Sequence, residues 1–129
     1  RETCQDIKTS LKDFNCKWET NKLFKHQEDR NSKGFSDQRA IRNNHNPEQL
    51  SKALYTFTVG SMKYLGYDLK DLKMPIYLIN GKDDTKYIKA SKEMLRLNPK
   101  SQSFIINNAH HNVHLENNED YIYTLDELI

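Results

Sequence analysis

The chain has 129 residues, of which 36% are hydrophobic, and its 20 basic and 18 acidic residues leave a net charge of +2. A charge this evenly balanced excludes the basic surface that nucleic acid or an anionic membrane would require. The sequence has no apolar run of about 18 residues, the length that a transmembrane helix needs. We therefore expect a protein without a nucleic-acid or membrane partner, forming one domain or part of a larger one.

The first residue and the cysteines suggest a cytoplasmic fragment. The chain starts at Arg1 and shows no charged-then-apolar signal segment. Cys4 and Cys16 are the only cysteines. On one helix they would lie roughly 18 Å apart, too far for a disulfide. Two free thiols fit a reducing cytosol.

Residues 1–72 are predicted to be helical, with polar connections. Leu11, Phe14 and Trp18 share one helical face, whereas the polar stretch 25–37 favours a loop.

A further helix is predicted after residue 46. Asn46 followed by Pro47 is typical of a helix start, because Asn caps the helix and Pro fits its first turn. This helix is expected from Glu48 to about Val59, with Gly60 ending it. Residues 61–72 are expected to form an irregular connection.

Residues 73–129 are predicted to alternate strand and helix. Ile76–Ile79 is short and evenly apolar, which favours a buried parallel strand, and Ser103–Asn107 is expected to be a second strand. A helix over residues 86–97 would connect them, which makes the two strands parallel neighbours. Glu116–Ile129 is expected to be a closing helix. Since two strands do not form a stable sheet alone, we expect the other strands to come from an absent N-terminal half.

Polar residues follow both strands, where an open α/β sheet places its functional groups. Asp84 follows the first strand and His111 the second, 27 residues later, so an acid and an imidazole could meet as in a catalytic triad. The alternative for Asp84 is a helix N-cap, and Asp83 competes with it for the catalytic role. None of the four glycines builds the G-x-S-x-G elbow that would carry the serine of such a triad.

Three other features have a functional and a structural interpretation. His110-His111-x-x-His114 with Glu116 resembles a metal cluster, but adjacent histidines point apart, so we expect no metal site. Arg42 could pair with a carboxylate or be a solvated surface residue. Trp18 could line a pocket or belong to the core.

Several of these segments together resemble one family. They are Gly81-Lys82-Asp83-Asp84-Thr85-Lys86-Tyr87, Ala109-His110-His111-Asn112-Val113-His114-Leu115-Glu116-Asn117, Lys17-Trp18-Glu19 with Leu23-Phe24, and Arg42 to Pro47. They are similar to motifs in the C-terminal half of the 2-succinyl-6-hydroxy-2,4-cyclohexadiene-1-carboxylate synthases, α/β-hydrolase-fold enzymes of menaquinone biosynthesis. Lys22 stands where the family has Pro, and His110 where it has Gly.

The resemblance implies an α/β fold, with residues 1–72 as a helical cap and 73–129 as the last two parallel strands of the core and their helices. It implies a carbon–oxygen lyase that eliminates pyruvate from a succinyl-enolpyruvyl-cyclohexene carboxylate without a cofactor. Asp84 would be the triad acid and His111 the base, while Arg42 and Trp18 would contact the carboxylate substrate. The alternatives are a general ester or carbon–carbon bond hydrolase, and an inactive fragment or interaction module. We expect these 129 residues alone to be inactive.

Overall fold

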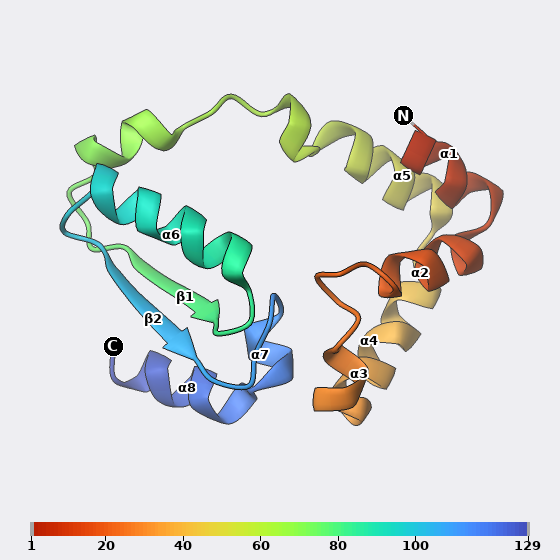
Figure 1. Cartoon of the computed structure of the whole chain (residues 1–129). Helices are drawn as coiled ribbons and strands as arrows, with labels where there is room; N and C mark the ends of the chain where they lie inside the picture. Colours follow the sequence, from red (N-terminus) through yellow and green to blue (C-terminus); the bar gives the residue numbers. More distant parts are fainter. Residues whose placement is uncertain (1, 129) are drawn as a thin grey trace.

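The computed structural model describes residues 2–128. Figure 1 shows a helical part and an α/β part, joined by an extended segment that contains two short 3-10 helices. The elements, in chain order, are α1 (Glu2–Thr9), α2 (Leu11–Glu19), α3 (Gln27–Arg30), α4 (Ser32–Asn43), α5 (Pro47–Thr56), η1 (Val59–Ser61), η2 (Gly66–Asp71), β1 (Tyr77–Gly81), α6 (Thr85–Leu97), β2 (Gln102–Ile106), α7 (Val113–Glu116) and α8 (Asn118–Asp126).

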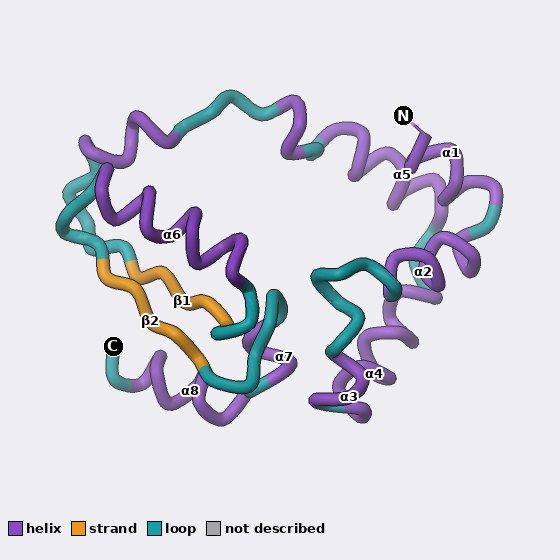
Figure 2. The backbone as a smooth tube through the Cα atoms, viewed as in Figure 1, coloured by secondary structure: helices purple, strands orange, loops and turns teal. Residues whose placement is uncertain are grey.

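The sheet of the described residues consists of β1 and β2 (Figure 2). The strands are parallel, with Tyr77 opposite Gln102 and Gly81 opposite Ile106. The connecting helix α6 lies along one face of the sheet, and α8 follows at the other side (Figure 1). The predicted strand–helix–strand unit with parallel neighbours is therefore confirmed.

The helix start predicted at Asn46 is also confirmed. The Asn46 side chain accepts a hydrogen bond from Gln49 N at 3.0 Å, and Pro47 is the first residue of α5. The helix ends at Thr56, earlier than expected, and Val59 and Gly60 lie in η1. Residues 61–72, predicted to be irregular, contain the last residue of η1 and all of η2, and otherwise lack regular structure.

The loop predicted over residues 25–37 is wrong, because α3 and the start of α4 occupy most of it. Asn31 caps α4 by accepting a hydrogen bond from Gly34 N at 2.9 Å, and its amide donates to Leu115 O at 2.9 Å. Phe35 is buried at 3% exposure. A polar sequence therefore becomes helical here because Asn31 caps the helix while its amide bonds to the distant Leu115, and because the Arg39 and Arg42 side chains of the same helix lie over the Phe35 ring.

The single closing helix predicted over Glu116–Ile129 is also wrong. The chain forms α7, breaks at Asn117 and continues as α8. The Asn117 side chain accepts a hydrogen bond from Asp120 N at 3.3 Å and so starts a new helix. Ile129 lies outside the described residues.

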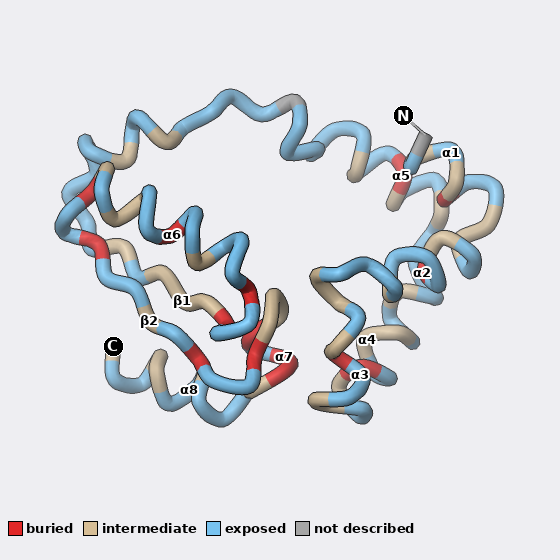
Figure 3. Tube along the Cα trace, in the orientation of Figure 1, coloured by how far each residue is buried: buried red, intermediate tan, exposed pale blue. Residues whose placement is uncertain are grey.

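The predicted burial of the first strand is not observed in this chain. Tyr77 is exposed, and in β1 only Gly81 is buried. Many apolar side chains along the extended segment are likewise open to solvent, namely Tyr55, Phe57, Val59, Met62, Tyr64, Leu65, Tyr67, Leu72 and Met74. Buried residues gather instead near the ends of the two strands, in α7, and where α3 and α4 meet (Figure 3). Within residues 2–128, no helix is both long and apolar enough to cross a bilayer.

Candidate functional site

The candidate site lies where β1 and β2 end, and Gly81 allows the two ends to meet. Lys82 N donates to Ile106 O at 2.8 Å, and Asp83 N donates to Ala109 O at 3.0 Å. A Cβ atom on Gly81 would lie 2.1 Å from His110 O and 2.3 Å from Ala109 O. Only a residue without a side chain permits this approach of two backbones.

Asp84 both caps a helix and contacts the imidazole, the two alternatives that its sequence context left open. Its Oδ1 accepts a hydrogen bond from Tyr87 N at 3.2 Å and thereby caps α6. Its Oδ2 lies 2.8 Å from His111 Nδ1. The residue is 3% exposed, so the contact with the imidazole is shielded from water on the carboxylate side.

Asp83, the competing acid, points elsewhere. Its Oδ2 lies 2.6 Å from Arg30 Nη2. The hydrogen bond from Arg30 lowers the pKa of the Asp83 carboxyl below its ordinary value. The geometry thus separates two neighbouring acids, of which Asp84 faces the imidazole.

The loop that carries His111 is held by its own backbone. Asn108 has a positive φ of 51°, which Asn tolerates better than most residues. On either side of His111, the N–H groups of His110 and Asn112 point at the Glu116 carboxylate, at 2.6 and 3.4 Å. Glu116 therefore fixes the peptide that presents the imidazole.

The His111 ring lies between aromatic side chains, and the ring centroids of Tyr87 and Phe24 are 4.5 and 5.8 Å away. Its side chain is 29% exposed. A cavity of about 170 Å³ adjoins the ring and is lined by β1 and α6 residues together with Asp84. In the tautomer with the proton on Nδ1, this nitrogen donates to Asp84 Oδ2 and leaves Nε2 free to accept a proton.

Trp18 and Arg42, the two candidate substrate contacts, line one small cavity of about 90 Å³ between the helices. The Trp18 ring stacks on Phe24 with centroids 5.2 Å apart, and Phe24 connects it to His111. Asn112, the residue after His111, also lines the cavity. The structure thus brings both residues close to the Asp84–His111 pair.

Arg42 is not a freely solvated residue. Its Nη2 lies 2.9 Å from Glu19 Oε1, and Arg39 binds the same carboxylate at 2.9 Å. Burial alone would raise the pKa of Glu19, but the hydrogen bonds from the two arginines lower it below its ordinary value. Arg39 also pairs with Glu28 at 3.5 Å, so two guanidinium groups and two carboxylates form a cluster without net charge.

Sequence reasoning missed Gln27, Arg30 and the structural role of Glu116. Gln27 is 2% exposed and lines the cavity with Trp18 and Arg42. Its Nε2 and the Nε of Arg42 are buried N–H donors without a partner among the residues described. Only the tertiary structure places the Gln27 amide in a cavity, because the segment that contains it looks like an ordinary polar loop.

The histidine cluster does not form a metal site in the structure. Within residues 2–128, no group of three His, Cys, Asp or Glu side chains is placed to hold a metal ion. The His110 ring lies nearest to His26, at a centroid distance of 6.1 Å, whereas His111 faces Asp84. The exposed His114 ring lies beside Tyr121.

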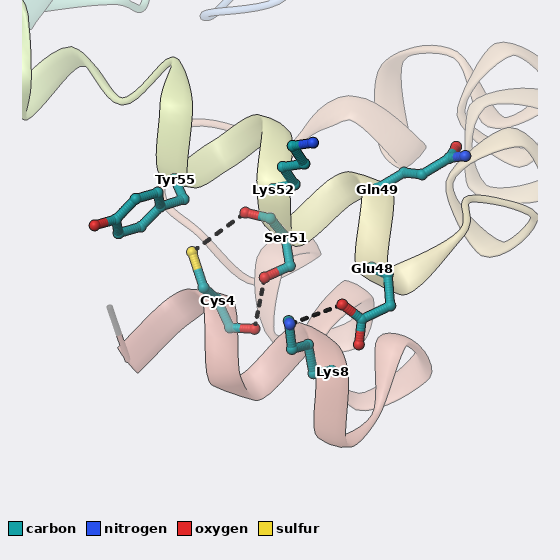
Figure 4. Close-up of a pocket in the computed structure, with 7 residues that line it drawn as sticks. All are labelled: Cys4, Lys8, Glu48, Gln49, Ser51, Lys52 and Tyr55. Carbon is teal, nitrogen blue, oxygen red and sulfur yellow. Dashed lines mark hydrogen bonds and ion pairs between the residues drawn. The ribbon is translucent and has the colours of Figure 1, made fainter.

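A separate cavity of about 480 Å³ lies between α1 and α5 (Figure 4). It contains Ser51, whose hydroxyl donates to Cys4 O at 3.2 Å. Lys8 and Glu48 form an ion pair at its rim, 2.7 Å apart. No histidine is among the described residues that line this cavity. Cys4 and Cys16 are free thiols, as predicted.

The structure matches that of MenH from S. aureus, with a TM-score of 0.92 and 24% sequence identity. The match covers 98% of this chain and 48% of MenH. The chain has part of an α/β-hydrolase fold. It spans about half the length of MenH, over the C-terminal half of that protein. No family model and no curated protein matches the sequence.

Proposed function

We propose that this chain is the C-terminal half of an α/β-hydrolase-fold lyase that eliminates pyruvate from a succinyl-enolpyruvyl-cyclohexene carboxylate in menaquinone biosynthesis. The observation that carries the proposal is the 2.8 Å contact between Asp84 and His111 at the ends of neighbouring parallel strands. The likeness to MenH supports the same fold. The particular reaction is inferred from the resemblance of the sequence motifs around these residues to those of the synthase family.

In this proposal His111 relays the proton, and Asp84 holds the ring. A serine from the missing half abstracts a proton from the substrate carbon, and His111 Nε2 accepts the serine proton. Electrons from the broken C–H bond form a ring double bond as the C–O bond breaks, and the enolpyruvyl group leaves as the enolate of pyruvate. The enolate takes up a proton on its terminal carbon to give pyruvate, and His111 returns its proton so that the catalytic groups regain their starting state. Asp84 keeps the imidazole in the correct tautomer and stabilises its protonated form.

The small cavity that Trp18 and Arg42 line would bind a carboxylate of the substrate. Arg42 and Gln27 present buried N–H groups without partners, and such donors are costly unless a ligand or water accepts from them. Trp18 would form an apolar wall against the substrate.

The missing half of the fold is the partner that this proposal requires. Among the residues described, no serine hydroxyl is bonded to His111, and β1 pairs only with β2. The exposed apolar residues between Tyr55 and Met74 are surface that further strands and helices would cover. By this account the 129 residues alone lack activity.

The experiment combines the chain with a first half that carries a G-x-S-x-G elbow and measures pyruvate release from the menaquinone precursor. A panel of p-nitrophenyl esters tests the general hydrolase as the competing function. Release of pyruvate, with ester turnover much slower, supports the lyase. Ester turnover without pyruvate assigns the chain to a general hydrolase, and no turnover with either substrate makes it an inactive or interaction module.

A further inference from the structure

Arg30 is the last residue of α3, in the helical part, yet its guanidinium contacts both loops of the candidate site. Its Nη2 lies 2.6 Å from Asp83 Oδ2, and its Nη1 lies 3.2 Å from Glu116 Oε2. Asp83 and Asp84 are adjacent in the sequence. Glu116 accepts the N–H groups on either side of His111. The Arg30 side chain thus contacts the sequence neighbour of Asp84 and the carboxylate that holds the His111 loop.

Glu116 makes this contact important. The Glu116 side chain is fully buried, at 0% exposure, and Arg30 is the basic residue that pairs with it. A buried carboxylate that loses its counter-charge is strongly unfavourable. Movement of the carboxylate toward solvent would weaken its hydrogen bonds with the His110 and Asn112 N–H groups.

The other contacts between the two parts do not duplicate this ion pair. Asn31 donates to Leu115 O at 2.9 Å, the Phe24 and His111 ring centroids are 5.8 Å apart, and the His26 and His110 ring centroids are 6.1 Å apart. None of these contacts is with the side chain of Glu116 or Asp83. Figure 1 shows α3 approaching the α/β part beside α7, on the side away from the extended connection.

We propose that Arg30 is a positioning residue, a latch that couples docking of the helical part to the geometry of the Asp84–His111 pair. While Arg30 pairs with both Asp83 and Glu116, the loops that carry Asp84 and His111 keep one spacing. When these ion pairs break, the two loops separate, and the helical part and the α/β part each keep their own fold. The proposal rests on the proposed function only where it takes Asp84 and His111 to be catalytic. The effect of Arg30 on the spacing of the two loops can be tested without measuring turnover.

The test compares Arg30→Gln, Arg30→Lys and Asp83→Asn with the native 129-residue chain. Amide hydrogen exchange is measured for His110, in the loop, and for Ile88, which lies in α6 and donates to Asp84 O. The NMR chemical shifts of the His111 ring provide a second, independent measure of the contact between His111 and Asp84. Arg96→Gln is the matched control, since Arg96 pairs with Glu93 on the exposed surface of α6.

For Arg30→Gln we expect exchange at His110 to accelerate at least about tenfold, because the buried Glu116 carboxylate that accepts the His110 N–H loses its ion pair. Exchange at Ile88 should change less than about twofold, since α6 stays folded. The His111 resonances should shift, and Arg30→Lys should restore part of the native behaviour. Asp83→Asn changes an acid whose side chain is 51% exposed and keeps the fold, so it should give a smaller shift in the same direction.

Unchanged exchange at His110 in both Arg30→Gln and Asp83→Asn would overturn the latch. Equal acceleration at His110 and Ile88 would also overturn it, because Arg30 would then contribute only to global stability. If Arg30→Gln does not fold, Arg30→Lys and Asp83→Asn decide by the same criteria. These outcomes do not depend on pyruvate release, so failure of the latch and failure of the proposed function can be told apart.

Discussion

Replacing Gly81 with Ala should destabilise the chain at the junction that creates the site. The added Cβ would lie 2.1 Å from His110 O, 2.3 Å from Ala109 O and 2.4 Å from Ala109 C. These are backbone atoms, and an ordinary contact begins near 3.4 Å. The end of β1 must therefore move away from the loop by about 1 Å.

That movement has a cost that can be worked from the structure. Overpacking of a tight site typically costs about 1–3 kcal/mol. The same shift weakens two hydrogen bonds, Lys82 N to Ile106 O and Asp83 N to Ala109 O, each contributing about 1 kcal/mol. We therefore expect Gly81→Ala to lower the free energy of unfolding by about 3–5 kcal/mol.

Chemical denaturation followed by circular dichroism measures this effect, with Gly60→Ala as the matched control. A Cβ at Gly60 would lie 3.8 Å from the Thr58 side chain, an ordinary contact, so the control should stay within about 1 kcal/mol of the native chain and could be more stable. If the two variants unfold at the same denaturant concentration, the close approach at Gly81 is not what builds the site.

Three further predictions concern side chains with measurable contributions to stability. Asp84→Ala should be less stable than Asp84→Asn by about 1 kcal/mol in denaturant titrations, because Asn can cap α6 and Ala cannot; equal stability would refute the capping role. The pKa of Glu19 is lowered in the folded chain from its ordinary value of 4.5, so the ionised carboxylate stabilises the fold above pH 4.5, and this contribution is lost as the pH falls through the folded pKa. The Glu19→Gln variant should therefore lose less unfolding free energy than the native chain when the pH falls below 4.5. An equal dependence on pH in the two chains would contradict this. Asn31→Ala removes a helix cap and a hydrogen bond to Leu115 O, so it should lower the free energy of unfolding by about 2 kcal/mol. Asn46→Ala, which removes a cap alone, should lower it by about 1 kcal/mol. Thermal unfolding measures both, and equal effects would exclude a contribution from the Leu115 contact.

The sequence predicts the acid–base pair because parallel strands end at the same edge of a sheet, whatever lies around them. Asp84 and His111 each follow an apolar run, and the intervening helix returns the chain to its starting edge. The choice of Asp84 over Asp83 could not be made from the sequence. It depends on Arg30, a residue 53 positions away that binds Asp83.

The errors of prediction have the same origin. Residues 25–37 look like a loop because the stabilising partner of Asn31 is the distant Leu115 O. The break at Asn117 separates α7 from α8 because that side chain caps a new helix and also donates to Asn107 O. Gln27 gains its place in the cavity only from the packing of α2, α3 and α4. Contacts between distant residues decide each case, and periodicity carries no signal for them.

The most direct test of the central claim is pyruvate release by the chain combined with a first half that carries the serine elbow, compared between the native sequence and His111→Ala. Exposed His45 provides the matched control as His45→Ala. We expect His111→Ala to lower the rate at least about a thousandfold and His45→Ala to leave it unchanged. Undiminished pyruvate release from His111→Ala would contradict the account, because the Asp84–His111 pair would then take no part in the reaction.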